Sequence, residues 1–341
     1  MKLLFKIMLC CAVVGLLACK EREEHKAPAT GKPYDIFVVM PEAEWKGELG
    51  DTLRSILLEE VPMLNQREPR FDLYHIVPGN YKGLLLQHRN LLTLNVSPSV
   101  GEPAMVAEYD VDAVPQLRVT LQGPSDSTVL AYVDANREAL QRIFEMAERD
   151  RFVNKGKAFP EKSINRLIEE KFGFTMSIPM GYTVRKEAPN FLWISYEMPL
   201  ASQGIFIYSY PLTSGANFTV PYLVEKRNEF AALIPGPTDG SRMTTSQEIE
   251  PVLNTVIING RLWFEMRGFW DVTGDYMGGP FVSYTTVDAT RKEMVTIDGY
   301  VYSPKHGKRN YIRQLESLIF NVEFPTDTTA SVRVPVVNPQ P

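Results

Sequence analysis

The chain has 341 residues, of which 44% are hydrophobic and 23% charged, a composition typical of a globular protein and not of a disordered or polytopic membrane protein. At roughly 100 to 200 residues per domain, this length is sufficient for two domains. The net charge of -5 argues against a nucleic-acid partner, because binding to a phosphate backbone requires clustered Lys and Arg residues.

The N-terminus has the features of a targeting signal. Residues 1–18 join two early lysines to an apolar run that is too short to cross a bilayer, which requires about 20 apolar residues. Residues 16–19, Leu-Leu-Ala-Cys, resemble a bacterial lipobox, in which cleavage precedes a cysteine that then carries lipid. The sequence therefore predicts a signal peptide over 1–18 and lipid attachment at Cys19. The alternative is a plain secretory signal in which Cys19 is incidental.

The remaining cysteines and the residues after Cys19 extend this prediction. Cys10 and Cys11 lie inside the signal peptide, so a disulfide, a cysteine nucleophile and a cysteine-ligated zinc site are excluded from the mature chain. Residues 19–32, which are charged and small, are predicted to form a flexible tether. Lys20 resembles the sorting signal for the outer membrane, and the acidic residues after it resemble a surface export tag. The membrane face stays open between periplasm and surface, and the surface is preferred.

Residues 33–158 are predicted to form an acidic α/β domain. The predicted elements are, in order, a strand over 35–40, a helix over 41–57, a strand over 71–76, a helix over 81–87, strands over 90–96 and 116–121, and helices over 125–133 and from 134 onward. This alternation of strands and helices favours a layered α/β domain. Residues 33–150 have 10 Lys plus Arg against 19 Asp plus Glu, and this net charge of -9 indicates a soluble surface or recognition of a cationic partner.

Residues 159–324 are predicted to form an α+β domain on an antiparallel sheet. The predicted strands are 191–197, 204–210, 261–272, 281–287 and 294–302, and the predicted helices are 220–234 and 310–321. In the strand 261–272, alternation places Met266 and Trp270 on a core face, and Glu265 and Arg267 on a solvated face. The end of the chain, 325–341, is predicted to be disordered.

A set of short motifs resembles one protein family. They are Gly31-Lys32-Pro33-Tyr34, Trp45-Lys46-Gly47, His88-Arg89-Asn90, Pro115-Gln116, Glu148-Arg149-Asp150-Arg151, Tyr276-Met277-Gly278-Gly279-Pro280-Phe281 and Lys308-Arg309-Asn310-Tyr311. Together with the lipobox they look like an uncharacterised family of bacterial lipoproteins that is known only as a domain of unknown function. The resemblance implies an envelope location and a two-domain organisation, and it supplies no catalytic residue. Separately, residues 172–324 resemble the PsbP-like α-β-α sandwich at the level of the fold.

The candidate binding loop lies between two long predicted strands. Trp270, Asp271, Asp275 and Tyr276 could form a polar pocket with aromatic faces for a sugar or a peptide. A hairpin with bulges explains the same residues and is preferred. A glycosidase pair of Asp271 and Asp275 would need carboxyl groups about 5 to 9.5 Å apart across a cleft, which one hairpin rarely provides.

The histidines and the basic turn 303–309 are weaker candidates for a functional site than the predicted binding loop. The four histidines, which show no metal-ligand spacing on a helix, are His25, His75, His88 and His306. His75 faces away from Asp72, three residues earlier in a predicted strand, and a capping role is preferred for His88 over ligand contact. The basic turn 303–309 either binds an anion or is solvated. No phosphate loop, dinucleotide fingerprint or GxSxG motif indicates a cofactor or a serine hydrolase.

The sequence as a whole predicts a lipid-anchored protein of the outer membrane that acts by non-catalytic binding or assembly. Its partners would be the membrane, through acylated Cys19, and envelope proteins or glycans. Two alternatives stay open, an envelope hydrolase acting on glycan or peptide and a surface receptor for a nutrient ligand. Replacing Asp271, Asp275 or His75 with Ala would abolish turnover by a hydrolase and leave an envelope scaffold unaffected.

Overall fold

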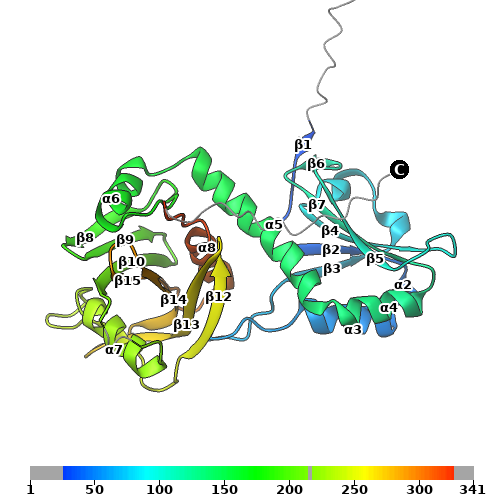
Figure 1. Ribbon diagram of the computed structural model, residues 1–341. Coiled ribbons are helices and arrows are strands. Elements are labelled where there is room, and N and C mark those ends of the chain that lie inside the picture. The colour runs from blue at the N-terminus through cyan, green and yellow to red at the C-terminus, as the bar shows by residue number, and fades with distance from the viewer. Residues whose placement is uncertain (1–25, 214–216, 326–341) are drawn as a thin grey trace, which may run out of the picture.

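The structure, a computed structural model, describes residues 26–213 and 217–325 and folds them into two domains connected by the long helix α5 (Arg137–Ala158) (Figure 1). The predicted signal peptide, Cys19, the start of the predicted tether and the predicted disordered tail from residue 326 lie outside the described residues. Among the described residues, no helix is long and apolar enough to cross a membrane. The predicted boundary at residues 158 and 159 stays a prediction.

The N-terminal domain is built on a five-stranded sheet. In sheet order the strands are β3 (Asp72–Ile76), β2 (Asp35–Val39), β4 (Asn90–Val96), β7 (Leu117–Gly123) and β5 (Ala104–Tyr109); β5 runs antiparallel to β7 and the other pairs are parallel. The helices that pack apolar side chains against one face are α3 (Glu48–Leu57), α4 (Asp126–Ala135) and α5. The predicted layered α/β architecture is confirmed.

Short elements account for the differences from the predicted order of this domain. The extended backbone of Gly47 divides the first predicted helix into α2 (Glu42–Lys46) and α3. The helix predicted to end at Gln87 is the 3-10 helix η2 (Gly83–Gln87), which follows the 3-10 helix η1 (Pro78–Asn80). β5 was not predicted, because its half-buried residues lack a regular apolar alternation.

The end of the predicted tether pairs with the N-terminal domain. β1 (Ala27–Pro28) runs parallel to β6 (Ala113–Val114). The backbone N–H of Thr30 donates to the carbonyl of Gln87 at 2.8 Å. The structure therefore attaches the chain to the domain from residue 27, through main-chain hydrogen bonds that a charged and polar composition does not reveal.

The C-terminal domain is built on a curled antiparallel sheet. In sheet order the strands are β11 (Met243–Thr245), β13 (Arg261–Val272), β14 (Gly278–Asp288), β15 (Glu293–Tyr302), β10 (Ser202–Pro211), β9 (Phe191–Glu197) and β8 (Thr183–Ala188), and β12 (Val252–Ile258) also pairs with β13. The helices α6 (Lys162–Phe172) and α8 (Arg309–Ile319) cover one face, and α7 (Val220–Ala231) covers the other. The predicted α+β class is confirmed, with α6, β8, β11 and β12 as additional elements.

Strand β13 corrects the prediction that one of its faces is solvated. Trp263 and Glu265 lie on that face and are only 1% and 7% exposed, whereas Leu262 on the predicted core face is 51% exposed. The reason is that helices cover both faces of this sheet, and α8 packs over the side chains of Glu265 and Arg267. Strand alternation separates the two faces correctly but does not reveal which face another element covers.

Candidate functional site

The last helix, α8, starts on the acidic N-terminal domain. The carboxylate of Glu68 accepts hydrogen bonds from the backbone N–H groups of Lys308 at 2.7 Å and Arg309 at 3.1 Å. These N–H groups have no partner within the helix, and the helix dipole favours a negative charge at this end. The Arg309 guanidinium also donates to Asp72 at 2.7 Å. Two residues of the basic turn 303–309 thus bind anionic side chains of the chain's own first domain.

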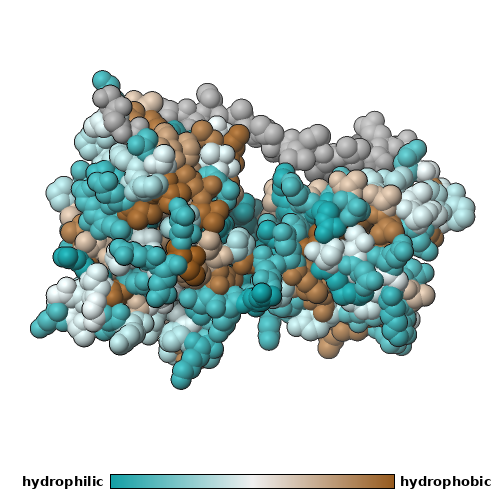
Figure 2. All heavy atoms as spheres, turned by 90° about the horizontal axis from the view of Figure 1, so that it is seen from below, coloured by the Kyte–Doolittle hydropathy of each residue, from teal (hydrophilic) through white to brown (hydrophobic). Residues whose placement is uncertain are grey.

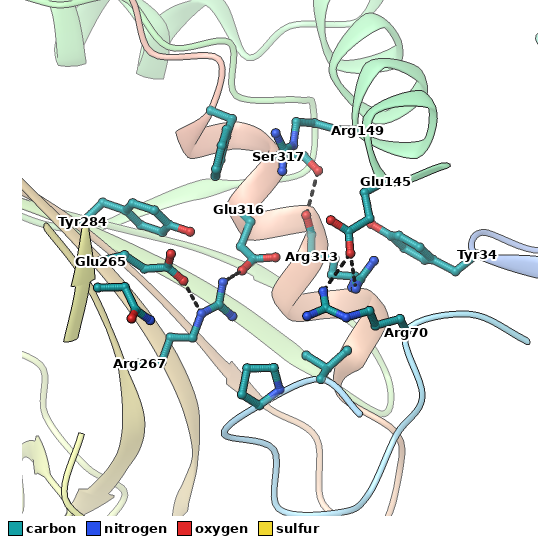
Figure 3. Close-up of a pocket in the computed structure, with 14 residues that line it drawn as sticks. Tyr34, Arg70, Glu145, Arg149, Glu265, Arg267, Tyr284, Arg313, Glu316 and Ser317 are labelled. Carbon is teal, nitrogen blue, oxygen red and sulfur yellow. Dashed lines mark hydrogen bonds and ion pairs between the residues drawn. The ribbon is translucent and has the colours of Figure 1, made fainter. Parts of the chain in front are cut away.

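The junction between the domains is rich in charged side chains. Figure 2 shows hydrophilic residues gathered at the waist between the two lobes. A cavity of about 310 Å³ lies at this junction among α5, α8 and β13 (Figure 3). We call it the ion-pair cavity; its charged lining residues are Arg70, Glu145, Arg149, Glu265, Arg267, Arg313 and Glu316.

On the N-terminal side of the ion-pair cavity, two arginines share one glutamate. Glu145 on α5 accepts hydrogen bonds from Arg70 and from Arg313 on α8, each at 2.9 Å. The three side chains are at least three-quarters buried. Burial would raise the pKa of Glu145, but Arg313 and Arg70 outweigh it and hold this pKa below its ordinary value. Glu145 is therefore ionised at neutral pH. Arg70 also pairs with Glu59 at 3.0 Å, so the two arginines are matched by two carboxylates.

On the C-terminal side of the ion-pair cavity, two glutamates share one arginine. Arg267 on β13 donates to Glu265 on the same strand and to Glu316 on α8. Burial raises the pKa of Glu265, and the neighbouring Arg267 opposes this shift. With both carboxylates ionised, this group carries one excess negative charge. The two groups are joined by α8, which supplies Arg313 to one and Glu316 to the other, three residues apart on one side of the helix.

Arg149 is the cavity's one charged residue for which the described part of the chain provides no carboxylate partner. Its guanidinium carbon lies 3.6 Å from the centre of the Phe320 ring, an attractive cation–π geometry. Ser317, which also lines the cavity, donates its hydroxyl to the carbonyl of Arg313 at 2.6 Å. The ion pairs of this cavity can hold the two domains together, and Arg149 can attract an anion. The Ser317 hydroxyl donates to a backbone carbonyl and not to a side chain that could act as a general base.

Tyr34 lies at the centre of the junction. It lines the ion-pair cavity and also a second cavity, described below. Its backbone has a φ of 69°, which is uncommon for a residue with a side chain. The guanidinium carbon of Arg313 lies 4.7 Å from the centre of its ring, and the residue is 5% exposed. Such strained positions persist where the surrounding structure fixes them and are frequent at functional sites.

The structure separates the residues of the predicted binding loop. Trp270 is 1% exposed, donates its indole N–H to the carbonyl of Val301 at 3.2 Å, and lines a cavity of about 380 Å³. We call this the aromatic cavity; its aromatic lining residues are Trp193, Trp270, Tyr300 and Tyr302. Asp271 and Asp275 do not belong to its lining, and Tyr276 is fully exposed. The preferred hairpin is present, with Asp271 opposite Gly278 in the β13–β14 pairing.

The histidines of the N-terminal domain have structural contacts. The His75 ring stacks on Trp45 with 5.0 Å between the ring centres, and its Nε2 lies 2.9 Å from the carbonyl oxygen of Met40. His88 is 2% exposed and stacks on Phe37 at 3.6 Å, and burial lowers the pKa of its ring. Within the described residues, no three His, Cys, Asp or Glu side chains form a group that could hold a metal ion.

Sequence reasoning missed the residues of the ion-pair cavity. Arg313 and Glu145 are 168 positions apart, so no local pattern connects them. The available signal was on the last helix, where Arg309, Arg313 and Glu316 recur at helical spacing beside the apolar stripe. A charged stripe on a helix is usually exposed to solvent, whereas the arginines of this stripe contact the N-terminal domain.

Two family models match the chain. DUF8532 matches residues 29–157, and DUF4837 matches residues 161–321; both are described as domains of unknown function. The chain is composed of two domains of unknown function. This confirms the resemblance to an uncharacterised family. The DUF8532 region supplies Arg70, Glu145 and Arg149 to the ion-pair cavity, and the DUF4837 region supplies its other charged residues. No curated protein matches the sequence.

Solved structures show only weak similarity. The Ran-binding protein Mog1p of Saccharomyces cerevisiae has 11% identity and a TM-score of 0.31, over 45% of this chain and 91% of that one. LpqN, involved in cell envelope biogenesis of Mycobacterium tuberculosis, has 13% identity and a TM-score of 0.26, over 43% of this chain and 79% of that one. Human StAR-related lipid transfer protein 5 has 8% identity and a TM-score of 0.20, over 51% of this chain and 95% of that one. Scores this low carry no inference about function.

Proposed function

We propose that this chain is a lipid-anchored protein of the outer membrane that acts by non-catalytic binding or assembly. The lipobox that ends at Cys19 carries the proposal, because lipidation there fixes the protein to the membrane and leaves its folded surface for partners. The pairing of β1 with β6 adds a geometric consequence. An extended chain spans at most about 3.5 Å per residue, so the path from Cys19 to Ala27 would keep the first domain within about 30 Å of the bilayer.

The contacts at the domain junction support binding over catalysis. Glu145, Glu265 and Glu316 are each engaged by an arginine. His75 and His88 have backbone carbonyl oxygens within hydrogen-bond distance. A general acid or base must be available to a substrate, and side chains that are committed to structural partners are better suited to holding the domains together.

The anchor can be tested by labelling with a tagged fatty acid in a Gram-negative host that expresses the full chain. We expect the wild-type protein to incorporate label and to sediment with the outer membrane, and the Cys19→Ala variant to lose both properties. Cys11→Ala is the matched control, because it changes a cysteine inside the same predicted signal and should keep the label. Label retained by Cys19→Ala, or absent from the wild type, would contradict the proposal.

The membrane face needs a separate experiment. Protease treatment of intact cells should degrade a surface-exposed protein and spare one in the periplasm until the outer membrane is opened. A known periplasmic lipoprotein serves as the control for membrane integrity. Degradation in intact cells supports the surface tag predicted after Cys19, and survival until the membrane is opened would direct the search for partners to periplasmic assembly machinery and the cell wall.

A second candidate function, a receptor for a nutrient ligand, is favoured by the aromatic cavity. Trp193 donates its indole N–H to the Tyr300 hydroxyl at 2.9 Å, and the ring centres of Trp270 and Tyr300 are 5.3 Å apart. Fixed aromatic rings in a concave site offer stacking faces to a sugar or a peptide side chain. Sugars or peptides that bind there should raise the unfolding temperature of the wild type and have no effect on a Trp193→Ala variant.

A further inference from the structure

A second cavity at the domain junction has a different lining from the ion-pair cavity. It measures about 520 Å³, and Tyr34 lines both. Helix α5 contributes Arg151 and Lys155, which are one helical turn apart and so lie on one side of the helix, and Phe159 follows directly after the helix ends. The lining therefore changes from cationic to apolar along α5. We call it the amphipathic cavity.

The cationic end has more positive than negative side chains. Glu148 is 2% exposed and is shared by Arg89 and Arg151, each at 2.8 Å. Lys155 forms no ion pair within the described part of the chain. The cavity lining thus has three cations and one carboxylate. Burial lowers the pKa of Arg151 even with Glu148 in contact, which is the direction expected where a cation is incompletely compensated.

The excess of positive charge is larger in the lining of this cavity than in that of its neighbour. The same three cations also border another cavity, of about 570 Å³, whose lining includes Asp110 and Asp150. The lining of that cavity thus has three cations and two carboxylates, which leaves one excess positive charge there. On the side of the amphipathic cavity, Glu148 is the one lining carboxylate among the described residues.

Two buried donors in the lining of this cavity have no hydrogen-bond partner among the described residues. They are Nε of Arg89 and the hydroxyl of Tyr182, which is 3% exposed. Both residues line the amphipathic cavity. Buried polar groups in native proteins are nearly always hydrogen-bonded, so an unpaired donor beside a cavity points to a ligand or water that carries an acceptor.

The apolar end is formed by one side chain just after α5 and by two from the C-terminal domain. Phe159, Met180 and Tyr196 are 62%, 63% and 36% exposed. Phe159 and Met180 are neighbours, because the N–H of Met180 donates to the carbonyl of Phe159 at 2.9 Å. A single exposed apolar residue is ordinary, but three at the mouth of one cavity form a patch that marks an interaction site.

We propose that the amphipathic cavity binds a single-chain anionic amphiphile, with its carboxylate or phosphate at Arg151 and Lys155 and its alkyl chain on Phe159, Met180 and Tyr196. Charge complementarity selects the anionic head, and the apolar patch selects the chain. The inference deepens the proposed binding function by naming its ligand class. It holds whether or not Cys19 is acylated.

The test uses residues 20–341 without lipid, which retain every described residue, and calorimetric titration below the micelle concentration. Dodecanoate and dodecyl phosphate distinguish a fatty-acid head from a phosphate head, and acetate supplies the head without the chain. We expect the wild type to bind at least one of the two amphiphiles and not acetate. Binding of neither amphiphile, or binding of acetate at equal affinity, would overturn the proposal.

Matched variants locate the site. Lys155→Glu and Met180→Asp should each weaken amphiphile binding by at least about ten-fold, because one reverses a charge at the head and the other places a charge at the chain. Lys157→Glu makes the same charge change at an exposed position of α5 outside the lining, and its affinity should stay within about two-fold of the wild type. Equal binding by Lys155→Glu and wild type would overturn the proposal.

Circular dichroism should show the same fold for all three variants, since the replaced side chains are exposed. This inference and the proposed anchor fail separately. Loss of amphiphile binding leaves fatty-acid labelling at Cys19 unchanged, and loss of labelling leaves the titration of the lipid-free chain unchanged.

Discussion

The two cavities that Tyr34 lines differ in how their charges are paired. In the ion-pair cavity each glutamate contacts at least one arginine, and three of the four lining arginines form ion pairs. In the amphipathic cavity, Arg89 and Arg151 share Glu148, Lys155 forms no ion pair among the described residues, and the apolar patch begins just after α5 ends. Paired buried charges fix the geometry of the domain junction, whereas incompletely paired cations beside apolar surface remain available to a ligand.

The largest expected effect comes from breaking the shared glutamate. Among the described residues, Glu145→Gln leaves Arg313 without an ion-pair partner and Arg70 with Glu59 alone, and we expect the free energy of unfolding to fall by about 2 to 3 kcal/mol. Chemical denaturation measures this change. The matched control is Glu138→Gln on the same helix, whose side chain is 90% exposed, and it should change stability by less than about 0.5 kcal/mol. Equal effects would show that the ion-pair cavity does not hold the domains together.

The same variant gives a pH dependence with a defined sign. The pKa of Glu145 is lowered in the folded protein, so its ion pairs contribute fully above the ordinary glutamate pKa of about 4.3 and are lost as the pH falls through the folded-state pKa. The stability difference between wild type and Glu145→Gln should therefore be largest at neutral pH and shrink toward about pH 3. Denaturation curves at several pH values measure it. A difference that does not change with pH would mean that Glu145 acts through packing alone.

A smaller effect is expected from the cation that has no carboxylate partner in the ion-pair cavity. Arg149→Gln removes the contact with Phe320 and should cost about 0.5 to 1 kcal/mol of unfolding free energy. Thermal unfolding with a calorimetric enthalpy gives this value. A loss above about 2 kcal/mol would indicate that Arg149 neutralises a buried charge, and would remove the distinction between it and the paired arginines.

The smallest effects should come from exposed side chains. Lys155→Gln at the amphipathic cavity and Tyr276→Ala in the predicted binding loop should each change the free energy of unfolding by less than about 0.5 kcal/mol, because neither side chain has a buried partner. Chemical denaturation of the two variants tests this. A large loss for Lys155→Gln would place this residue in the structural framework and weaken its assignment to ligand binding.

The fold class was predictable because it depends on local periodicity. The helix predicted over 310–321 is α8, whose Ile312, Leu315 and Ile319 are at most 1% exposed. The strand predicted over 204–210 is β10, whose Phe206 and Tyr208 are buried. The lipid anchor and the domain boundaries stay predictions, since the described residues do not test them.

The charged junction was not predictable for a physical reason. Periodicity reports which residues share a face, and it does not report what covers that face. Glu265 and Arg267 were assigned to solvent because a strand with polar residues on one face usually has that face wet. Their burial depends on Glu316, which lies 49 positions from Arg267. In the predicted loop, the β13–β14 turn leaves Tyr276 in solvent while Trp270 enters the aromatic cavity.

The most direct test of the contrast between the two cavities is one amphiphile titration on two variants. Dodecanoate, or dodecyl phosphate if that is the head the wild type binds, is titrated into Lys155→Gln and Arg149→Gln. Both variants remove one positive charge from α5, but the residues line different cavities. We predict that Lys155→Gln loses affinity by about ten-fold, while Arg149→Gln stays within about two-fold of the wild type. Loss of affinity in Arg149→Gln with none in Lys155→Gln would contradict the account and assign ligand binding to the ion-pair cavity.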